Sequence, residues 1–144
     1  DDALHATKAA IEEGIVPGGG AALLYARESI DQCNIGSGIV YKACSKPFEQ
    51  ILINAGHDAV SSQMIGRDLV KDKNNTWNGY NIKTDLIVDM KQKGIIDPTK
   101  VTRTALENAA AVAGTVLLTE CIVVDEPKDD KQPQMDPSMM GMGM

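Results

Sequence analysis

The stretch Pro17-Gly18-Gly19-Gly20 constrains the fold of this chain more than any other, because it separates two segments that both have helical patterns. A glycine loses more backbone entropy on ordering than any other residue. Three in succession therefore indicate either a tight joint between helices or a place where the backbone approaches a ligand closely. The free N–H groups of the following helix would point back into the turn and favour a phosphate there. The residues alone leave both interpretations open.

Length and composition predict one compact domain that does not bind nucleic acid. The chain has 144 residues, of which 43% are hydrophobic, and this is enough for a real core. Its formal net charge of -6 opposes the phosphate neutralisation on which nucleic-acid binding depends. No run of about 18 apolar residues predicts a membrane span. The chain begins without methionine and inside a helical pattern, so we expect upstream sequence.

Cysteine and histidine give no sign of a metal site or a disulfide framework. The three cysteines, Cys33, Cys44 and Cys121, are far apart and odd in number, and no histidine cluster lies near them. We expect them to be small hydrophobic core residues in a reducing compartment. His5 and His57 are isolated, so we expect structural roles for both.

Apolar periodicity and capping residues predict a mainly helical fold. The first expected helix ends at Gly14, and the second runs from Ala21 to about Ile30. A third runs from Gly36 to Lys46 and restarts after Pro47, and a fourth begins at an Asp58 cap and runs to about Val70. The segment from Pro98 to Leu118 is apolar almost all round. We expect it to be the central buried helix.

The remaining segments predict little β-structure and a flexible end. Asn78-Gly79 is typical of a type I′ hairpin turn, and a small helix or turn is expected from Leu86 to Lys93. The apolar run 121–124 predicts an edge strand that needs a partner, which another subunit could provide. Beyond Pro127 the chain holds five of the seven methionines without periodicity, so residues 129–144 are predicted to be a flexible Met/Gly tail.

Two aspartates could carry chemistry, although each also has an ordinary structural explanation. Asp97 could cap the helix that starts at Pro98, or its carboxylate could accept a hydrogen bond from a ligand hydroxyl. Asp2 lies near the start of the sequence, and its ordinary explanation is a charged side chain in water at the surface. The glycine turn has neither the G-x-G-x-x-G spacing nor a following Lys-Ser or Lys-Thr pair, so neither Rossmann nor P-loop chemistry is indicated.

Several multi-residue runs together resemble the C-terminal part of the group I chaperonins, the class of GroEL and the mitochondrial heat-shock chaperonins. The runs are DDALHATKAAIEEGIVPGGGAALL, ILINAGHD, NGYNIKTDLIVDM, KGIIDPTKVTRTALENAAAVAGTVLLTECIVVDEPK and MMGMGM. The resemblance implies that residues 1–13 end an intermediate domain and that residues 14–128 form the C-terminal half of a helical equatorial domain. That half-domain would contain a short β-hairpin and a C-terminal edge strand.

The resemblance also implies an ATP site to which this chain contributes the adenosine side. Gly18 and Gly19 would lie beside the ribose and base, and Asp97 would accept hydrogen bonds from the ribose hydroxyls. Asp2 matches the aspartate that orients or activates the attacking water. The remaining adenine-side positions would be Asn81, Ile82, Lys83 and Ile95. Mg²⁺ would be held mainly by the N-terminal half of the domain, so this chain alone should not hydrolyse ATP.

On this resemblance the whole protein is an ATP-dependent folding chaperone that forms a seven-membered homo-oligomeric ring, single or double. Unfolded clients and a co-chaperonin would bind an apical domain that this sequence does not contain. Neither nucleic acid nor membrane is an expected partner. The expected location is the mitochondrial matrix, with bacterial cytoplasm and plastid as alternatives. A second function stays open, in which the chain is a structural ring-assembly module that does not bind nucleotide.

Overall fold

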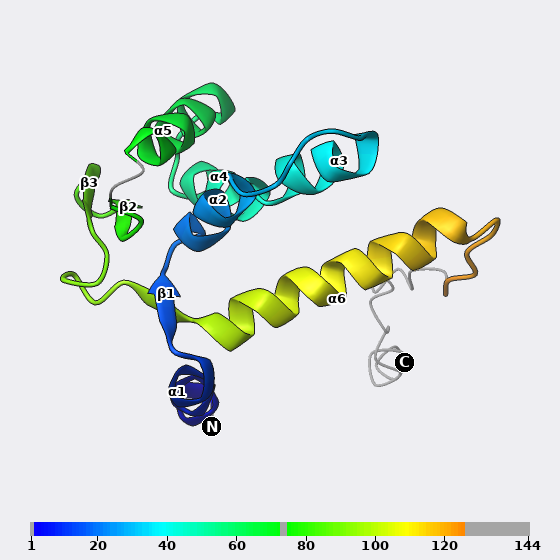
Figure 1. Cartoon of the computed structure of the whole chain (residues 1–144), viewed down its shortest axis with the longest axis horizontal. Helices are drawn as coiled ribbons and strands as arrows, with labels where there is room; N and C mark the ends of the chain where they lie inside the picture. The colour runs from blue at the N-terminus through cyan, green and yellow to red at the C-terminus, as the bar shows by residue number, and fades with distance from the viewer. Residues whose placement is uncertain (1, 73–74, 126–144) are drawn as a thin grey trace, which may run out of the picture.

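The structure is a computed structural model that describes residues 2–72 and 75–125. Within these residues it is mainly helical, with four short strands (Figure 1). The elements are α1 (Asp2–Glu13), β1 (Ile15–Pro17), α2 (Ala21–Arg27), α3 (Ile35–Ala43), α4 (Lys46–Asn54), α5 (Ala59–Lys71), β2 (Asn78–Asn81), β3 (Leu86–Asp89), β4 (Ile96–Pro98) and α6 (Thr99–Leu118). The predicted mainly helical fold class is confirmed.

Local signals in the sequence explain where the helices begin and end. Asp58 Oδ1 accepts hydrogen bonds from the backbone N–H groups of Val60 and Ser61, both at 2.9 Å, and so caps α5 as predicted. Pro47 lies in the first turn of α4, where its missing N–H costs nothing. Gly14, with a φ of 81°, follows the last residue of α1 in the left-handed conformation that glycine tolerates.

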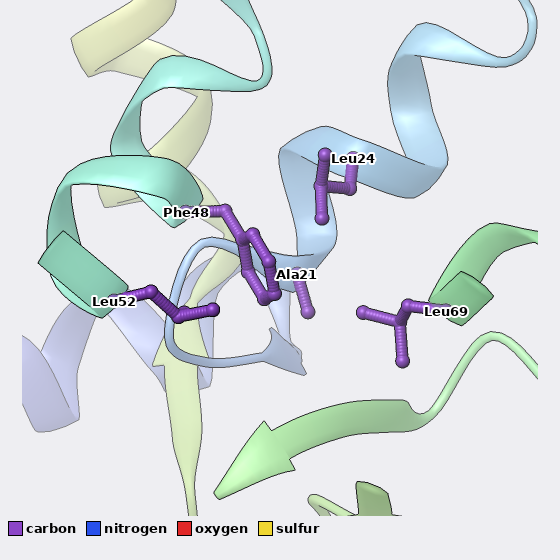
Figure 2. Close-up of a cluster of buried hydrophobic side chains, with 5 residues drawn as sticks. All are labelled: Ala21, Leu24, Phe48, Leu52 and Leu69. Carbon is purple, nitrogen blue, oxygen red and sulfur yellow. The ribbon is translucent and has the colours of Figure 1, made fainter. Parts of the chain in front are cut away.

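A small hydrophobic core joins α2, α4 and α5. Figure 2 shows the Phe48 ring between these helices, with the other core side chains directed towards it. Phe48 is the one phenylalanine in the sequence and is 1% exposed. Its buried companions are Ala21, Leu24, Leu52 and Leu69. Burial of apolar side chains is the main stabilising contribution in this part of the molecule.

The four strands form two antiparallel pairs, and one pair is the hairpin that the sequence predicted. β2 pairs with β3, and Asn78 and Gly79 lie inside β2, where the sequence predicted the turn. The chain turns instead between Asn81 and Leu86, where Asp85 adopts a φ of 53°. Asn81 Oδ1 accepts the Lys83 N–H at 3.0 Å and supports this turn. Of the expected helix or turn from Leu86 to Lys93, the first half is wrong because β3 occupies it, and the second half is a turn that runs from Met90 to Gly94.

Contacts of Tyr25 attach the hairpin to the helical part, and contacts of Trp77 close the base of the hairpin itself. The Tyr25 hydroxyl lies within hydrogen-bonding distance of three backbone oxygens, those of Asn78 at 3.1 Å, Asn75 at 3.3 Å and Leu69 at 3.4 Å, so α2 is tied to the start of β2 and to the end of α5. Trp77 O accepts the Met90 N–H at 2.9 Å, and the Lys91 ammonium lies 5.4 Å from the centre of the Trp77 ring. The hairpin therefore has a fixed position beside α2 and α5.

The predicted central helix is not central. α6 leaves the β1–β4 pair as a long rod (Figure 1), and none of its residues is buried. Leu117 is 83% exposed and Leu118 is 89% exposed. The apolar composition was identified correctly, but within the described residues only α1 and β4 pack substantially against this helix. Most of its apolar surface therefore remains uncovered.

Exposed ion pairs fasten α1 to α6. Arg103 donates two hydrogen bonds to the Glu13 carboxylate, at 2.7 and 3.1 Å, and also pairs with Glu107 at 2.8 Å. Lys100 pairs with Glu12. These contacts lie at the C-terminal end of α1, beside the point where the chain enters β1.

The predicted C-terminal edge strand is not formed. Residues 121–125 are described and contain no strand, because the described chain offers no edge with which they pair. The predicted Met/Gly tail, residues 129–144, lies outside the described residues. Of the cysteines only Cys44 is buried, so the prediction for exposed Cys33 and Cys121 is wrong. Among the described helices, none combines the length and apolar character that a bilayer crossing requires.

Candidate functional site

The glycine turn packs tightly against another part of the same chain. Gly18 N–H donates to Ile95 O at 3.0 Å. A Cβ on Gly18 would lie 3.1 Å from both the carbonyl carbon and the oxygen of Ile95. A side chain at Gly18 would therefore push the backbone of residues 95–96 away by a few tenths of an ångström. This part of the turn is a tight joint, one of the two possibilities that the sequence left open.

The next two glycines have different surroundings. Gly20 has a φ of 78°, and a Cβ there would lie 2.7 Å from Phe48 N and 2.8 Å from Phe48 Cα. Gly20 thus lets α2 start directly against the backbone of α4. Gly19 has a φ of 65°, but a Cβ there would meet only the end of the Met90 side chain within 4 Å, at 3.4 Å. Gly19 is therefore the least obstructed residue of the turn.

The β1–β4 pair places Asp97 beside this turn. In the antiparallel register Asp97 lies opposite Val16, and Ile96 lies opposite Pro17. Asp97 belongs to β4, and the N-cap of α6 is Pro98, without a side-chain cap. The prediction that Asp97 caps the helix is therefore wrong. Strand pairing fixes the backbone at this position and removes Asp97 from the helix terminus.

The Asp97 carboxylate is half-buried and has no hydrogen-bonding group facing it. None of the hydrogen bonds or ion pairs of the described residues involves its oxygens. Burial raises the pKa of this carboxyl above its ordinary value, because the charged form loses hydration without gaining a partner. A half-buried acceptor that the protein leaves unpaired is suited to a ligand that brings its own donors.

Met90 connects the hairpin to the same place. Its side chain is 1% exposed and lies against Gly79 so closely that a Cβ on Gly79 would be 2.4 Å from Met90 Cγ. Met90 O accepts the Ile95 N–H at 2.9 Å, and Ile95 O in turn accepts the N–H of Gly18. Gly19 of the turn, Gly79 of the hairpin and Ile95 therefore all lie against one buried methionine.

The structure thus brings four of the eight predicted site residues into one neighbourhood. Gly18, Gly19, Ile95 and Asp97 are adjacent through the contacts above. Asn81 ends β2, and Ile82 and Lys83 form the exposed turn of the hairpin. No hydrogen bond of the described residues joins these three to the glycine turn, and Asn81 uses its side-chain oxygen within its own turn.

Asp2, like the three hairpin residues, is a predicted site residue that no hydrogen bond or ion pair of the described residues joins to the glycine turn. It begins α1, eleven residues before Glu13, which corresponds to roughly 16 Å along a helix axis at 1.5 Å per residue. The C-terminal end of α1 is held near α6, where the Thr99 N–H donates to Gly14 O at 3.1 Å. No hydrogen bond or ion pair of the described residues links Asp2 to Gly19 or Asp97.

Sequence reasoning missed Met90, Gly79 and the pairing of β1 with β4. Three-residue strands have no periodicity to detect, and their partners are about eighty residues apart. Gly79 was assigned to a turn because Asn-Gly is a strong turn signal. The isolated glycine within an apolar-aromatic run was the available sign of a close approach.

Comparison with known proteins agrees with this architecture. A family model described as the TCP-1/cpn60 chaperonin family matches residues 1–127. A solved structure, the crystal structure of a group III chaperonin in the open state, is similar with 29% sequence identity and a TM-score of 0.71. The match covers 80% of this chain and 25% of that chain, so the present chain spans about a quarter of the length of that chaperonin.

Proposed function

The chain belongs to the TCP-1/cpn60 chaperonin family, and on that premise we propose that it supplies the adenosine side of the ATP site in an ATP-driven protein-folding chaperone. The observation that carries the proposal is the half-buried, unpaired Asp97 carboxylate beside the glycine turn. A more specific assignment to group I rests on the resemblance of the sequence runs DALHAT, PGGG and IIDPTKVTR.

The nucleoside would lie against the glycine turn. Asp97 would accept hydrogen bonds from the two ribose hydroxyls, which are the donors that its carboxylate lacks. The open side of Gly19 and the backbone of Gly18 would let the sugar approach closely. Ile95 would contribute apolar contact with the base, and Asn81, Ile82 and Lys83 would border the adenine from the hairpin turn.

Asp2 would act on the phosphate side by orienting the attacking water. Catalysis of this kind depends on positioning a water in line with the γ-phosphate. Because Asp2 lies at the far end of α1, this role requires α1 to move relative to α6. Gly14 is the natural pivot, since it has a φ of 81° and nothing within 4 Å of a Cβ.

We further propose, on the same resemblance, that Mg²⁺ takes part and is held mainly by residues outside this chain. Among residues 2–72 and 75–125, no group of three or more His, Cys, Asp or Glu side chains is arranged to hold a metal ion. Seven-membered rings, unfolded clients, a co-chaperonin and the mitochondrial matrix belong to this same proposal. Bacterial cytoplasm and plastid are the alternative locations.

The test is nucleotide affinity of the intact protein that contains this chain. Asp97→Asn keeps the shape of the side chain but removes the charge that the ribose donors would bind. We expect about a tenfold weaker ATP affinity by isothermal titration, the loss typical of one or two charged hydrogen bonds. Asp68→Asn, on the exposed surface of α5, is the matched control and should bind as the parent does.

One observation favours the second function, a structural ring-assembly module without nucleotide binding. The end of α6 and the residues after it expose two short apolar runs, Leu117–Leu118 and Ile122–Val124, separated by residues 119–121. Such a surface is typical of a subunit contact. Unchanged ATP affinity in Asp97→Asn, together with ring assembly that is lost in Val123→Asp, would favour this structural account over the nucleotide site.

A further inference from the structure

A cavity lies among the helices, apart from the β1–β4 pair and the glycine turn. It has a volume of about 390 Å³ and lies between α2, α3, α4 and α5. The side chains that matter for its chemistry are Arg27, Tyr41, Lys42, Lys46, Glu49 and Arg67. None of the predicted nucleotide-site residues lines it, so it is separate from the site described above.

Arg27 is the unusual residue of this cavity. Its side chain is 10% exposed, although a guanidinium is rarely buried to this extent without full pairing. Its Nε donates to Glu28 Oε1 at 3.2 Å, and its guanidinium carbon lies 4.8 Å from the centre of the Tyr41 ring. Its terminal nitrogens, Nη1 and Nη2, donate no hydrogen bond to any part of the chain that the structure describes.

The charges around the cavity do not balance. Lys46 is engaged by Glu49, with the ammonium 2.7 Å from the carboxylate, and the Ser45 hydroxyl donates to the same carboxylate at 2.7 Å. Burial opposes ionisation of Glu49, but these two hydrogen bonds outweigh it and keep its pKa lowered. The two carboxylates, Glu28 and Glu49, offset two of the four cationic side chains, so a net charge of two positive units remains; the cations are Arg27, Lys42, Lys46 and Arg67.

Two of the cations are available for a ligand. Arg67 on α5 and Lys42 on α3 form no ion pair within residues 2–72 and 75–125. They come from different helices and border the same cavity as the open end of the Arg27 guanidinium. A small, multiply charged acceptor could therefore be bound from three directions.

We propose that this cavity binds a phosphate dianion, either inorganic phosphate or the phosphate group of a small monoester. The planar fork of Arg27 would bind two of the oxygens, as guanidinium groups do with phosphate. Arg67 and Lys42 would offset the remaining charge. Stacking on Tyr41 holds the fork in place, so little side-chain entropy is lost on binding. The volume exceeds that of one phosphate, so a small esterified group also fits.

The experiment titrates the purified protein with sodium phosphate in a phosphate-free and sulfate-free buffer, at constant ionic strength, by isothermal calorimetry. Saturable binding is expected. Arg67→Gln should weaken it about tenfold, and Arg27→Lys, which keeps the charge but removes the fork, should weaken it at least as much. Lys93→Gln, an exposed lysine far from this cavity on the chain, is the control and should bind as the parent does. Circular dichroism checks that each variant is folded. If Arg27→Lys does not fold, the phosphate affinity of Arg67→Gln alone tests the proposal.

Two further titrations identify the ligand. Glycerol phosphate binding as tightly as inorganic phosphate assigns the site to monoesters, whereas much weaker binding assigns it to the free ion. The proposal would be overturned if acetate, added to the same total anionic charge, competed as well as phosphate does. It would also be overturned if Arg67→Gln, Lys93→Gln and the parent bound phosphate with the same affinity. Asp97→Asn should leave phosphate binding unchanged, so this proposal and the nucleotide site fail independently.

Discussion

The helical cluster of α2, α4 and α5 and the arm formed by α1 and α6 are stabilised in different ways. The cluster is built around Phe48, and its helices hide their apolar side chains from water. The arm has no buried residue in either helix, and its helices are joined by exposed ion pairs. Buried apolar area gives large, salt-independent stabilisation, whereas exposed pairs give little. The cluster can therefore hold a site rigidly, and the arm can move.

The largest expected difference between the two regions comes from removing an apolar side chain in each. Phe48→Ala should lower the free energy of unfolding by about 3–5 kcal/mol, because it leaves a cavity in the core. Leu117→Ala on α6 should change it by less than about 0.5 kcal/mol, since its side chain is already in water. Urea unfolding followed by circular dichroism measures both. Equal costs would show that α6 is covered in solution and would end the comparison.

A smaller effect tests how the cluster joins the site. Gly20→Ala should destabilise the protein by about 2–4 kcal/mol, because it combines left-handed backbone strain with a clash against Phe48. Gly38→Ala in α3 is the matched control. A Cβ at Gly38 meets nothing within 4 Å, so this variant should gain about 0.5–1 kcal/mol from better helix propensity. A tolerated Gly20→Ala would contradict the tight joint between the turn and α4.

The smallest effect concerns the arm. Arg103→Gln removes the pair with Glu13, so amide hydrogens of α1 should exchange about two- to fivefold faster, with global stability unchanged. Lys71→Gln, which breaks an exposed pair on α5, should leave α1 unchanged. Slower or unaltered exchange in Arg103→Gln would mean that the ion pairs do not hold α1.

The same contacts predict how the arm responds to acid. Hydrogen bonds from Lys100 and Arg103 lower the pKa values of Glu12 and Glu13 below their ordinary value of 4.5. Because the folded pKa is depressed, the stabilisation is fully present above pH 4.5 and is lost as the pH falls through the folded values. The protection factors of α1 amides in the parent, which correct for the intrinsic pH dependence of exchange, should therefore fall below pH 4.5, and Arg103→Gln should reduce this dependence.

The sequence predicted those features that depend on near neighbours. Caps such as Asp58, and the stop at Gly14, act within a few residues, so the helices were placed nearly correctly. The hairpin turn was displaced because Asp85 takes the left-handed conformation without being a glycine. The pairing of Val16 with Asp97 joins residues that are distant in sequence, and no local sequence pattern predicts it. The site was therefore predicted by resemblance, and its geometry was not.

The exposed surface of α6 illustrates a different limit of prediction from sequence. A helix that is apolar almost all round must be covered by something, but the residues do not say which surface covers it. The prediction of a central helix assumed that this chain provides the cover, and the structure shows that its described residues do not. The edge strand at 121–124 was predicted to need a partner from another subunit, so it stays a prediction although residues 121–125 of this chain contain no strand.

The position of Trp77 has a practical consequence. It is the one tryptophan of the sequence. Its backbone carbonyl accepts a hydrogen bond from the Met90 N–H, and the Lys91 ammonium lies over its ring. Indole emission depends on nearby charge and hydration, and Met90 lies directly under the glycine turn. The protein thus contains its own fluorescent probe at the hairpin, so binding of a nucleotide at the proposed site can be tested optically without attaching a dye.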